Sequence, residues 1–261
     1  MDVKYVRGDM VKVCLITGAS SGLGEMFLKH SINLIDADEY WIVSRNKDKL
    51  DAIASKYDAK IKSVPVDLIN ESAISEIENL LTQENAQITA LINNAGFGKI
   101  GKVWEIPYYE QQKMISLNCS ALTGLCSVCV KFMKEKSFIL NVGSIAAFSP
   151  NANLNCYSAT KSYVFAFTNG LRFELKNKKI NACVCCPGPM QTPFLANANI
   201  NKCSSHAFDT LPYCNPDKVA RKSIIAAKKG KAVYTPTFFY KFYRILAKLI
   251  PVKIMMYLSK V

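Results

Sequence analysis

The chain has 261 residues, 50% of them hydrophobic, which predicts one α/β domain with a single large core. Its formal net charge of +13 comes mainly from the C-terminus: residues 218–261 hold 11 of the 33 basic residues and no acid, so the first 217 residues hold 22 basic against 20 acidic residues. No nucleic-acid-binding motif accompanies this charge, so a nucleic-acid partner is not expected.

Cysteine and histidine usage argues against a metal site. The ten cysteines have irregular spacing and many lie in apolar runs, which predicts free, buried thiols in a reducing, cytoplasmic compartment. Cys126 and Cys129 form one C-x-x-C, but the sequence has only two histidines, His30 and His206. The charged segment 1–10 predicts no signal peptide, and the absence of 18 consecutive apolar residues predicts no transmembrane helix.

Short apolar runs alternate with amphipathic helical patterns along most of the chain. Strands are predicted over residues 11–16, 40–43, 60–66, 88–92, 137–142, 180–186 and 231–235. Helices are predicted over residues 46–57, 71–83, 107–134, 155–177 and 217–229. This alternation indicates a doubly wound, Rossmann-type α/β fold: a parallel sheet of about seven strands with helices on both faces, in a single domain over residues 1–235.

A glycine-rich stretch, residues 17–24, follows the first predicted strand directly. Its glycines would let the backbone turn tightly and approach a pyrophosphate, which would lie on the N-terminal amides of the next helix. The spacing is G-x-x-x-G-x-G, which a plain chain reversal would also tolerate. The position favours a dinucleotide site formed by Gly18, Ser20, Ser21, Gly22, Leu23 and Gly24.

The ends of the next strands add to this site. Ser44 and Arg45 end the second strand without an acidic residue, and a hydroxyl with an arginine suits the 2′-phosphate of NADP(H) better than the 2′-hydroxyl of NAD(H). The alternative is an ordinary exposed arginine. Asp67, which precedes Leu68, would bind the adenine amino group or cap the next helix. Small residues and an amide follow the fourth strand and suit contact with a ribose: Asn94, Ala95 and Gly96.

Residue types suited to proton transfer lie in the second half of the chain. Tyr157 and Lys161 are one helical turn apart and share a face, where the lysine would lower the tyrosine pKa from about 10. Such a pair alone is more often solvated helix surface. Ser144 ends the fifth strand and could hydrogen-bond a carbonyl oxygen on which charge develops. Asn118 lies inside a predicted helix, where asparagine is unfavourable, which indicates another role.

In order and spacing, these motifs resemble the short-chain dehydrogenase/reductase family over residues 11–235. The resemblance implies that Tyr157 exchanges a proton with the substrate oxygen, which Ser144 orients. Lys161 would lower the tyrosine pKa and hold the nicotinamide ribose, and Asn118 would position a water molecule. The cofactor contacts that the resemblance adds are Tyr157, Lys161, Pro187, Gly188 and Thr192, with Thr192 on the nicotinamide carboxamide.

The resemblance also bears on substrate and assembly. It implies a lid over the substrate at about residues 189–212 and a homo-oligomer built through the helices that carry Asn118 and Tyr157. The loop 94–101 and the tail resemble a branch that includes ketoacyl and hydroxysteroid reductases. No Arg or Lys is placed to hold a carboxylate, so we expect a bulky, hydrophobic carbonyl or alcohol substrate. The apolar pocket is predicted to be lined by Phe97, Phe148, Leu154, Met190 and Phe194.

The tail, residues 236–261, is basic and amphipathic. Apolar residues fall at helical spacing, with Lys241, Arg244 and Lys248 on the opposite face, before Pro251 and a second apolar piece at 254–258. The pattern is typical of an interfacial membrane helix, which would give peripheral contact with an anionic membrane. A helix packed over the substrate pocket or against a dimer partner has the same pattern.

Together these features predict an NADPH-dependent oxidoreductase that interconverts a ketone or aldehyde and an alcohol through Ser144, Tyr157 and Lys161. The alternatives are a catalytically idle NADP(H)-binding sensor or a membrane-surface scaffold. Because all four catalytic positions are filled, the enzyme is favoured over the sensor.

Overall fold

The computed structural model of the protein describes residues 10–197 and 211–258. Within these residues, parallel strands form one seven-stranded sheet in the order β3-β2-β1-β4-β5-β6-β7. The strands are β1 (Val11–Thr17), β2 (Glu39–Ser44), β3 (Ile61–Pro65), β4 (Ala86–Asn93), β5 (Met133–Val142), β6 (Asn181–Cys185) and β7 (Val233–Tyr234). The central strands are apolar nearly throughout because helices cover both faces of the sheet.

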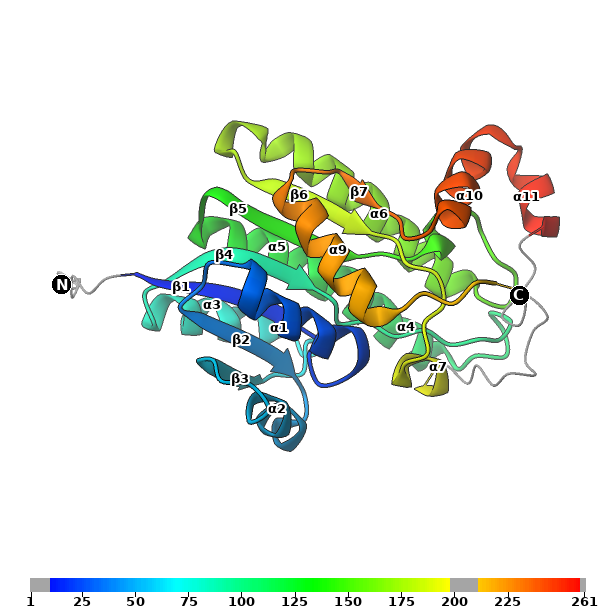
Figure 1. The fold of residues 1–261 in the computed structure, drawn as a ribbon. Helices are drawn as coiled ribbons and strands as arrows, with labels where there is room; N and C mark the ends of the chain where they lie inside the picture. The colour runs from blue at the N-terminus through cyan, green and yellow to red at the C-terminus, as the bar shows by residue number, and fades with distance from the viewer. Residues whose placement is uncertain (1–9, 198–210, 259–261) are drawn as a thin grey trace.

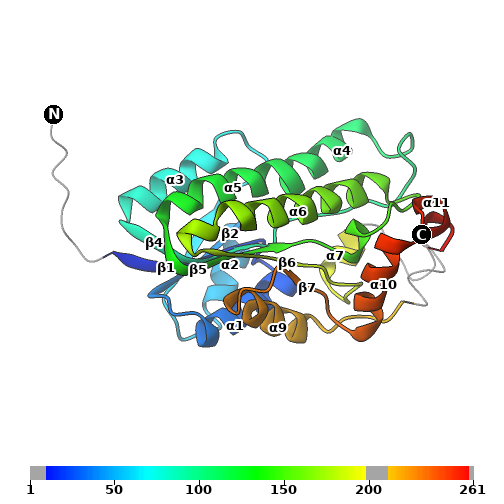
Figure 2. The same cartoon turned by 90° about the horizontal axis from the view of Figure 1, so that it is seen from above.

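Helices form a layer on each side of this sheet (Figure 1, Figure 2). One layer holds α1 (Gly22–Leu34), α2 (Lys47–Ala54) and α9 (Pro216–Lys228). The other holds α3 (Ala73–Gln83), α4 (Tyr108–Ile115), α5 (Leu122–Cys129) and α6 (Asn155–Glu174). Each layer has its own hydrophobic core, one built around Trp41 and the other around Phe27, and this confirms the predicted doubly wound Rossmann-type fold.

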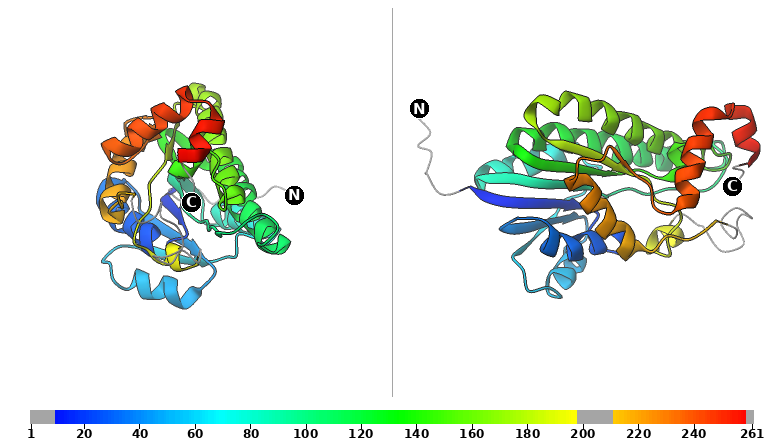
Figure 3. Two further views of the ribbon diagram at one scale, coloured as in Figure 1. Left: turned by 90° about the vertical axis from the view of Figure 1, so that its right-hand side faces the viewer. Right: turned by 45° about the horizontal axis from the view of Figure 1, so that its top comes forward.

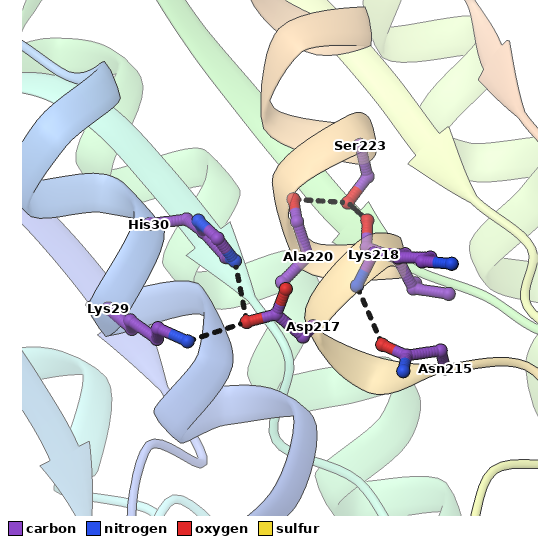
Figure 4. Close-up of polar contacts among 8 residues, drawn as sticks. Lys29, His30, Asn215, Asp217, Lys218, Ala220 and Ser223 are labelled. Atoms are coloured by element: carbon purple, nitrogen blue, oxygen red, sulfur yellow. Dashed lines mark hydrogen bonds and ion pairs between the residues drawn. The ribbon is translucent and has the colours of Figure 1, made fainter.

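A polar contact joins α1 to α9 on the first layer (Figure 4). Asp217 Oδ1 accepts a hydrogen bond from Lys29 Nζ at 2.8 Å and lies 3.0 Å from His30 Nε2. Asn215 caps α9 by accepting from Lys218 N at 3.0 Å. These groups are partly exposed, so the apolar residues between the two helices contribute more to their packing than the charges do.

The segment Tyr108–Phe132 is long and apolar enough to cross a membrane by length and composition alone. In the fold it packs against α3, α6 and β4, and Leu122, Leu125 and Cys129 are buried in the core. It is therefore a core helix of this domain. The helix predicted over residues 107–134 is not α-helical throughout. A π-helical turn, Ser116–Ala121, lies between α4 and α5, and a 3₁₀ turn, Val130–Phe132, ends the segment.

Two helices follow the last strand at the C-terminus. They are α10 (Phe238–Leu249) and α11 (Val252–Leu258), and they lie at the end of the molecule toward which the strands point (Figure 1, Figure 3). Tyr240 fixes α10 to the domain, because its ring is fully buried and its hydroxyl donates to Pro212 O at 2.7 Å. Tyr240 is thus one of the side chains that hold the tail on the fold.

The cysteines that the structure describes are all free, and most of them are buried. Burial raises the pKa of these thiols; for Cys14, Cys126 and Cys183 it reaches about 12. Thiols with such a pKa stay protonated at neutral pH and behave as small apolar side chains.

Candidate active site

The candidate site lies at the carboxyl ends of the strands, where the chain order reverses. Strand β1 lies between β2 and β4, so the chain runs outward to β3 and then returns across β1 to β4. A crevice at such a reversal is where ligands bind in open α/β sheets. The glycine-rich loop after β1, the loop after β4 and the N-terminus of α6 all contribute residues to this region.

Glycines at the end of β1 allow two backbone segments to come close together. Gly18 has φ +66°, and a Cβ at this position would lie 2.8 Å from Ala95 Cα, so no side chain fits there. A Cβ at Gly24 would lie 2.0 Å from Gly18 O, which packs the loop tightly against the first turn of α1. Gly22, also at positive φ, lies against Thr192 in the same way. The predicted turn is therefore present, with Leu23 buried behind it.

The N-terminus of α1 offers amide groups to an anion. Ser21 is the N-cap residue and, among the described residues, its side chain makes no capping hydrogen bond. Ser20 does not cap the helix either, because its hydroxyl accepts from Ser44 Oγ at 3.0 Å and so joins the loop to β2. Open amides at a helix start, beside a glycine cradle, fit the pyrophosphate of a dinucleotide.

Thr17 connects the loops after β1 and β4. Its buried hydroxyl accepts hydrogen bonds from the backbone N of Asn94 at 3.1 Å and of Ala95 at 3.0 Å. The Asn94 side chain donates in return to the carbonyls of Thr17 and Gly18, both at 3.1 Å. The sequence prediction did not include Thr17 in the site, although a buried hydroxyl at the end of an apolar strand is a signal that could have identified it.

The predicted adenosine end lies beside β2 and β3. Arg45 is exposed at the end of β2, next to the Ser44–Ser20 hydrogen bond. Asp67 is partly buried, and its Oδ1 accepts from Ile69 N at 3.2 Å, so the carboxylate holds its own turn. It does not cap α3, which begins after Ser72. Leu68 is buried under this turn.

Tyr157 and Ser144 approach each other in a buried environment. Both side chains are nearly inaccessible to solvent. Burial raises the pKa of Tyr157 to about 12, although its hydrogen bond with Ser144 acts in the opposite direction. The Ser144 hydroxyl also accepts from Ala146 N at 3.1 Å, which fixes the start of the turn after β5. Burial therefore keeps the tyrosine as a neutral phenol at neutral pH.

Lys161 lies one turn further along α6 and is also buried. Its Nζ donates to Val142 O at 2.8 Å and lies 5.7 Å from the centre of the Tyr157 ring. Burial lowers the Lys161 pKa to about 8. The predicted lowering of the tyrosine pKa by Lys161 is not found in this arrangement, because burial of the phenol raises that pKa.

Asn118 lies in the π-helical turn between α4 and α5. Its Oδ1 accepts from Phe97 N at 3.1 Å, and its Nδ2 donates to Phe97 O at 2.9 Å and to Thr160 Oγ1 at 3.1 Å. A π-turn widens the helix locally and is frequent at functional sites. The asparagine that is unfavourable in a helix thus connects the loop after β4 to α6.

Two further glycines bring the β4 loop onto the catalytic residues. A Cβ at Gly96 would lie 2.8 Å from Asn118 Oδ1 and 3.5 Å from Lys161 Nζ. A Cβ at Gly98 would lie 2.9 Å from Tyr157 Cδ2. Gly98 was not predicted as a site residue, because its partner is distant in sequence and no local pattern reveals the contact.

Three of the five predicted pocket residues gather around Tyr157. Leu154, Phe97 and Phe194 belong to its apolar cluster, and the Phe194 ring is 5.8 Å from the tyrosine ring. The sequence prediction missed the other apolar members of this cluster: Ile100, Met114, Ala146 and Cys156.

The other two predicted pocket residues lie elsewhere. Phe148 packs edge-on against Phe165 and also contacts Tyr243 of α10, and Met190 packs in the core beneath α9. Their assignment to the pocket is corrected, because both side chains are used to pack helices. Of the predicted lid at 189–212, residues 198–210 lie outside the described residues; the preceding short helix, α7 (Pro193–Asn197), carries Phe194.

The loop after β6 completes the site. Pro187 O accepts from Ile145 N at 3.0 Å, which ties this loop to the one that follows Ser144. Gly188 lies against the Tyr240 ring: a Cβ at this position would lie only 2.3 Å from Tyr240 Cε2. Thr192 lies against Gly22, so the β6 loop closes over the glycine-rich loop. Six loops and helices thus bring the predicted catalytic and cofactor residues together. Arg45 and Asp67 lie away from the others, at the predicted adenosine end of the site beside β2 and β3.

Comparison with known proteins agrees with this architecture. The family model described as short chain dehydrogenase matches residues 12–202. A probable short-chain type dehydrogenase/reductase, VdlC, from Helicobacter pylori is 30% identical over 182 residues, which are 69% of this chain and 65% of that relative.

Solved structures give the same result. A short-chain dehydrogenase from Sphingobium yanoikuyae in complex with NADPH is 26% identical, with a TM-score of 0.76 over 88% of this chain and 89% of that one. A 3-ketoacyl-(acyl-carrier-protein) reductase from Brucella melitensis, complexed with NADH, is 26% identical with a TM-score of 0.74 over 87% of this chain and 97% of that one. The chain belongs to the short-chain dehydrogenase/reductase family of oxidoreductases.

Proposed function

We propose that this protein is an NADPH-dependent reductase that interconverts a bulky, hydrophobic ketone or aldehyde and its alcohol. The observation that carries the proposal is the buried side chain of Tyr157, which lies beside Ser144 and inside an apolar cluster. A phenol with a pKa of about 12 keeps its proton at neutral pH, so it can donate that proton to a carbonyl oxygen.

The neighbouring polar groups support this role. Ser144 would share the substrate oxygen with Tyr157, because its hydroxyl lies within hydrogen-bonding reach of the phenol. A Lys161 pKa of about 8 leaves its ammonium mostly charged at pH 7, where it favours negative charge developing on the tyrosine oxygen. Asn118 would act by positioning, since both ends of its amide are already bonded to protein. The nicotinamide cofactor, when bound, supplies the hydride.

The cofactor site favours NADP(H) on the basis of charge. An exposed Arg45 beside the Ser44 hydroxyl suits a 2′-phosphate, and the β2 end carries no carboxylate to bind a 2′-hydroxyl. The open amides of α1 and the glycine cradle around Gly18 suit the pyrophosphate. A related short-chain dehydrogenase was solved with NADPH, and a related ketoacyl reductase with NADH, so the preference rests on Arg45.

The substrate class follows from the side chains around the reacting centre. Phe97, Leu154 and Phe194 surround the tyrosine with apolar surface, and Lys161 Nζ lies 5.7 Å from the centre of the tyrosine ring. A hydrophobic carbonyl compound gains free energy by burying its surface against these apolar side chains. The similarity to a ketoacyl reductase supports a long acyl chain as one such substrate.

We further propose a cytoplasmic homo-oligomer. The free thiols fit a reducing compartment. Helix α6 presents Tyr163, an exposed aromatic side chain that a second copy of the chain would cover.

Replacing Tyr157 by Phe removes the proton donor and keeps the ring that packs against Phe194. We expect kcat for carbonyl reduction to fall about 10²- to 10⁴-fold while NADPH binding, followed by fluorescence, is unchanged. Tyr163→Phe is the matched control, because it removes a hydroxyl from the exposed face of the same helix. Equal rates for Tyr157→Phe and the control would refute the assigned acid.

Arg45→Asp replaces the phosphate partner by a group suited to a 2′-hydroxyl. The ratio of kcat/KM for NADPH to that for NADH should fall about 10- to 100-fold, which corresponds to the loss of one charge-assisted hydrogen bond. Lys49→Asp makes the same charge change nearby on α2 and should leave the ratio unaltered. A ratio that does not respond to Arg45→Asp would show that this arginine does not select the cofactor.

Lys161 makes stability depend on pH in a defined direction. Its pKa is about 8 in the folded protein and 10.5 for a free lysine, so between these values the unfolded chain binds more protons and stability rises with pH. Relative to Lys161→Met, the wild type should gain about 3 kcal/mol of unfolding free energy across this window. Urea unfolding at several pH values measures this difference, in which all other titrating groups cancel. A difference that is constant with pH would mean that Lys161 is not desolvated.

A further inference from the structure

Helix α10 turns an apolar stripe toward solvent. Phe238, Phe242, Ile245 and Leu249 are spaced at i, i+4, i+7 and i+11, which places them along one side of the helix. Their exposed fractions are 83%, 52%, 54% and 75%, respectively. A helix that packed its apolar face on the domain would bury these residues, so the stripe is not the face by which α10 is held.

The opposite side of α10 holds it to the domain. Tyr240 is fully buried, with its ring against Gly188 and its hydroxyl bonded to Pro212 O. Arg244 Nη1 donates to Thr235 Oγ1 at 3.2 Å, and Tyr243 contacts Phe148. These contacts fix the rotation of α10 about its axis, and that rotation is what points the stripe outward. Packing of the stripe over the substrate pocket, one of the two alternatives from the sequence, is therefore wrong.

Helix α11 extends the exposed apolar surface. Val252, Ile254 and Met256 are exposed on it, while Met255 is buried. Both helices project at the end of the molecule beyond the carboxyl edge of the sheet, clear of the helical layers (Figure 1, Figure 3). Exposed apolar residues thus occur on both helices, between residues 238 and 256.

The charge around this surface identifies its partner. Lys241, Lys248 and Lys253 are exposed beside the apolar residues, and residues 218–261 contain no acid. Lysines that flank an apolar stripe can bury their stems at its border and place their ammonium groups among phosphates. We propose that α10 and α11 form a docking surface for an anionic phospholipid bilayer.

A bilayer fits these features better than a second protein. A protein partner would need a groove that matches a stripe about three helical turns long and that also carries acids along its border. A bilayer surface accepts such a stripe without shape matching, and its anionic headgroups attract every basic residue of the tail together. A second copy of this chain would bring the same lysines face to face, which is unfavourable.

Docking would bring the catalytic edge of the sheet toward the lipid. Tyr240 of α10 contacts Gly188 in the loop that closes the cofactor site, so the docking helix and this site are directly connected. A hydrophobic carbonyl compound dissolved in the bilayer would then reach the pocket without crossing water. This consequence rests on the proposed function, whereas docking itself does not.

Sedimentation of the full chain with vesicles tests the proposal without substrate. With phosphatidylcholine vesicles containing phosphatidylserine, the protein should pellet, and it should bind at least about 10-fold more weakly to phosphatidylcholine alone or at high salt. Phe242→Ser with Leu249→Ser should abolish pelleting. Phe173→Ser, at an equally exposed site on α6, should not.

A charge series separates specific docking from general attraction. Lys241→Glu with Lys248→Glu should release the protein from anionic vesicles, whereas Lys176→Glu with Lys178→Glu, the same charge change in the turn after α6, should not. Circular dichroism and urea unfolding would show that these surface variants keep the fold.

Wild-type protein that stays in the supernatant would overturn the proposal, and so would control variants that lose binding as fully as the tail variants. A stripe variant that lowers the mass of the protein in solution, while vesicle binding is absent, would assign the stripe to a second copy of the chain. Because no cofactor or carbonyl compound is present, an inactive enzyme would not affect either outcome.

Discussion

The site depends on the close approach of two backbone loops, after β1 and after β4. Glycine at position 18 removes the side chain that would collide with Ala95, and the Thr17 hydroxyl bonds to two amides of the facing loop. This contact fixes the position of Gly96, which in turn lies against Asn118 and Lys161. The spatial arrangement of the candidate catalytic region therefore depends on a steric constraint at the first turn of the chain.

Burial, more than pairwise charge, sets the protonation state of the candidate catalytic groups. Tyr157 and Lys161 lie in the same desolvated region, and each is shifted toward its neutral form. The hydrogen bond from Lys161 to Val142 O keeps the lysine oriented while it is shielded from water, and Ser144 lies beside the tyrosine. Such an arrangement is preorganised to stabilise negative charge on an oxygen atom, which is what carbonyl reduction requires.

The sequence was sufficient to predict the fold, and the structure brings most of the candidate site residues to one edge of the sheet, because strand ends and glycine spacing are local features. What it could not predict depended on long-range packing. The predicted direction of the Tyr157 pKa shift was wrong, because helical spacing shows that Lys161 is near the tyrosine but not how deeply both groups are buried. Phe148 was wrongly predicted to line the pocket, because its contact partner Tyr243 is 95 residues further along the sequence. The outward stripe on α10 depended on one buried residue, Tyr240, that a helical pattern does not distinguish.

The most direct test of the account is NADPH oxidation, followed by absorbance, against carbonyl compounds graded by size and polarity. The panel would include small aldehydes, long-chain β-ketoacyl thioesters and polycyclic ketones, with NADH assayed in parallel. We predict turnover with NADPH that is confined to bulky, hydrophobic carbonyls and is weaker with NADH. Tight NADPH binding with no turnover across the panel would contradict the catalytic assignment, and equal use of NADH would contradict the role given to Arg45.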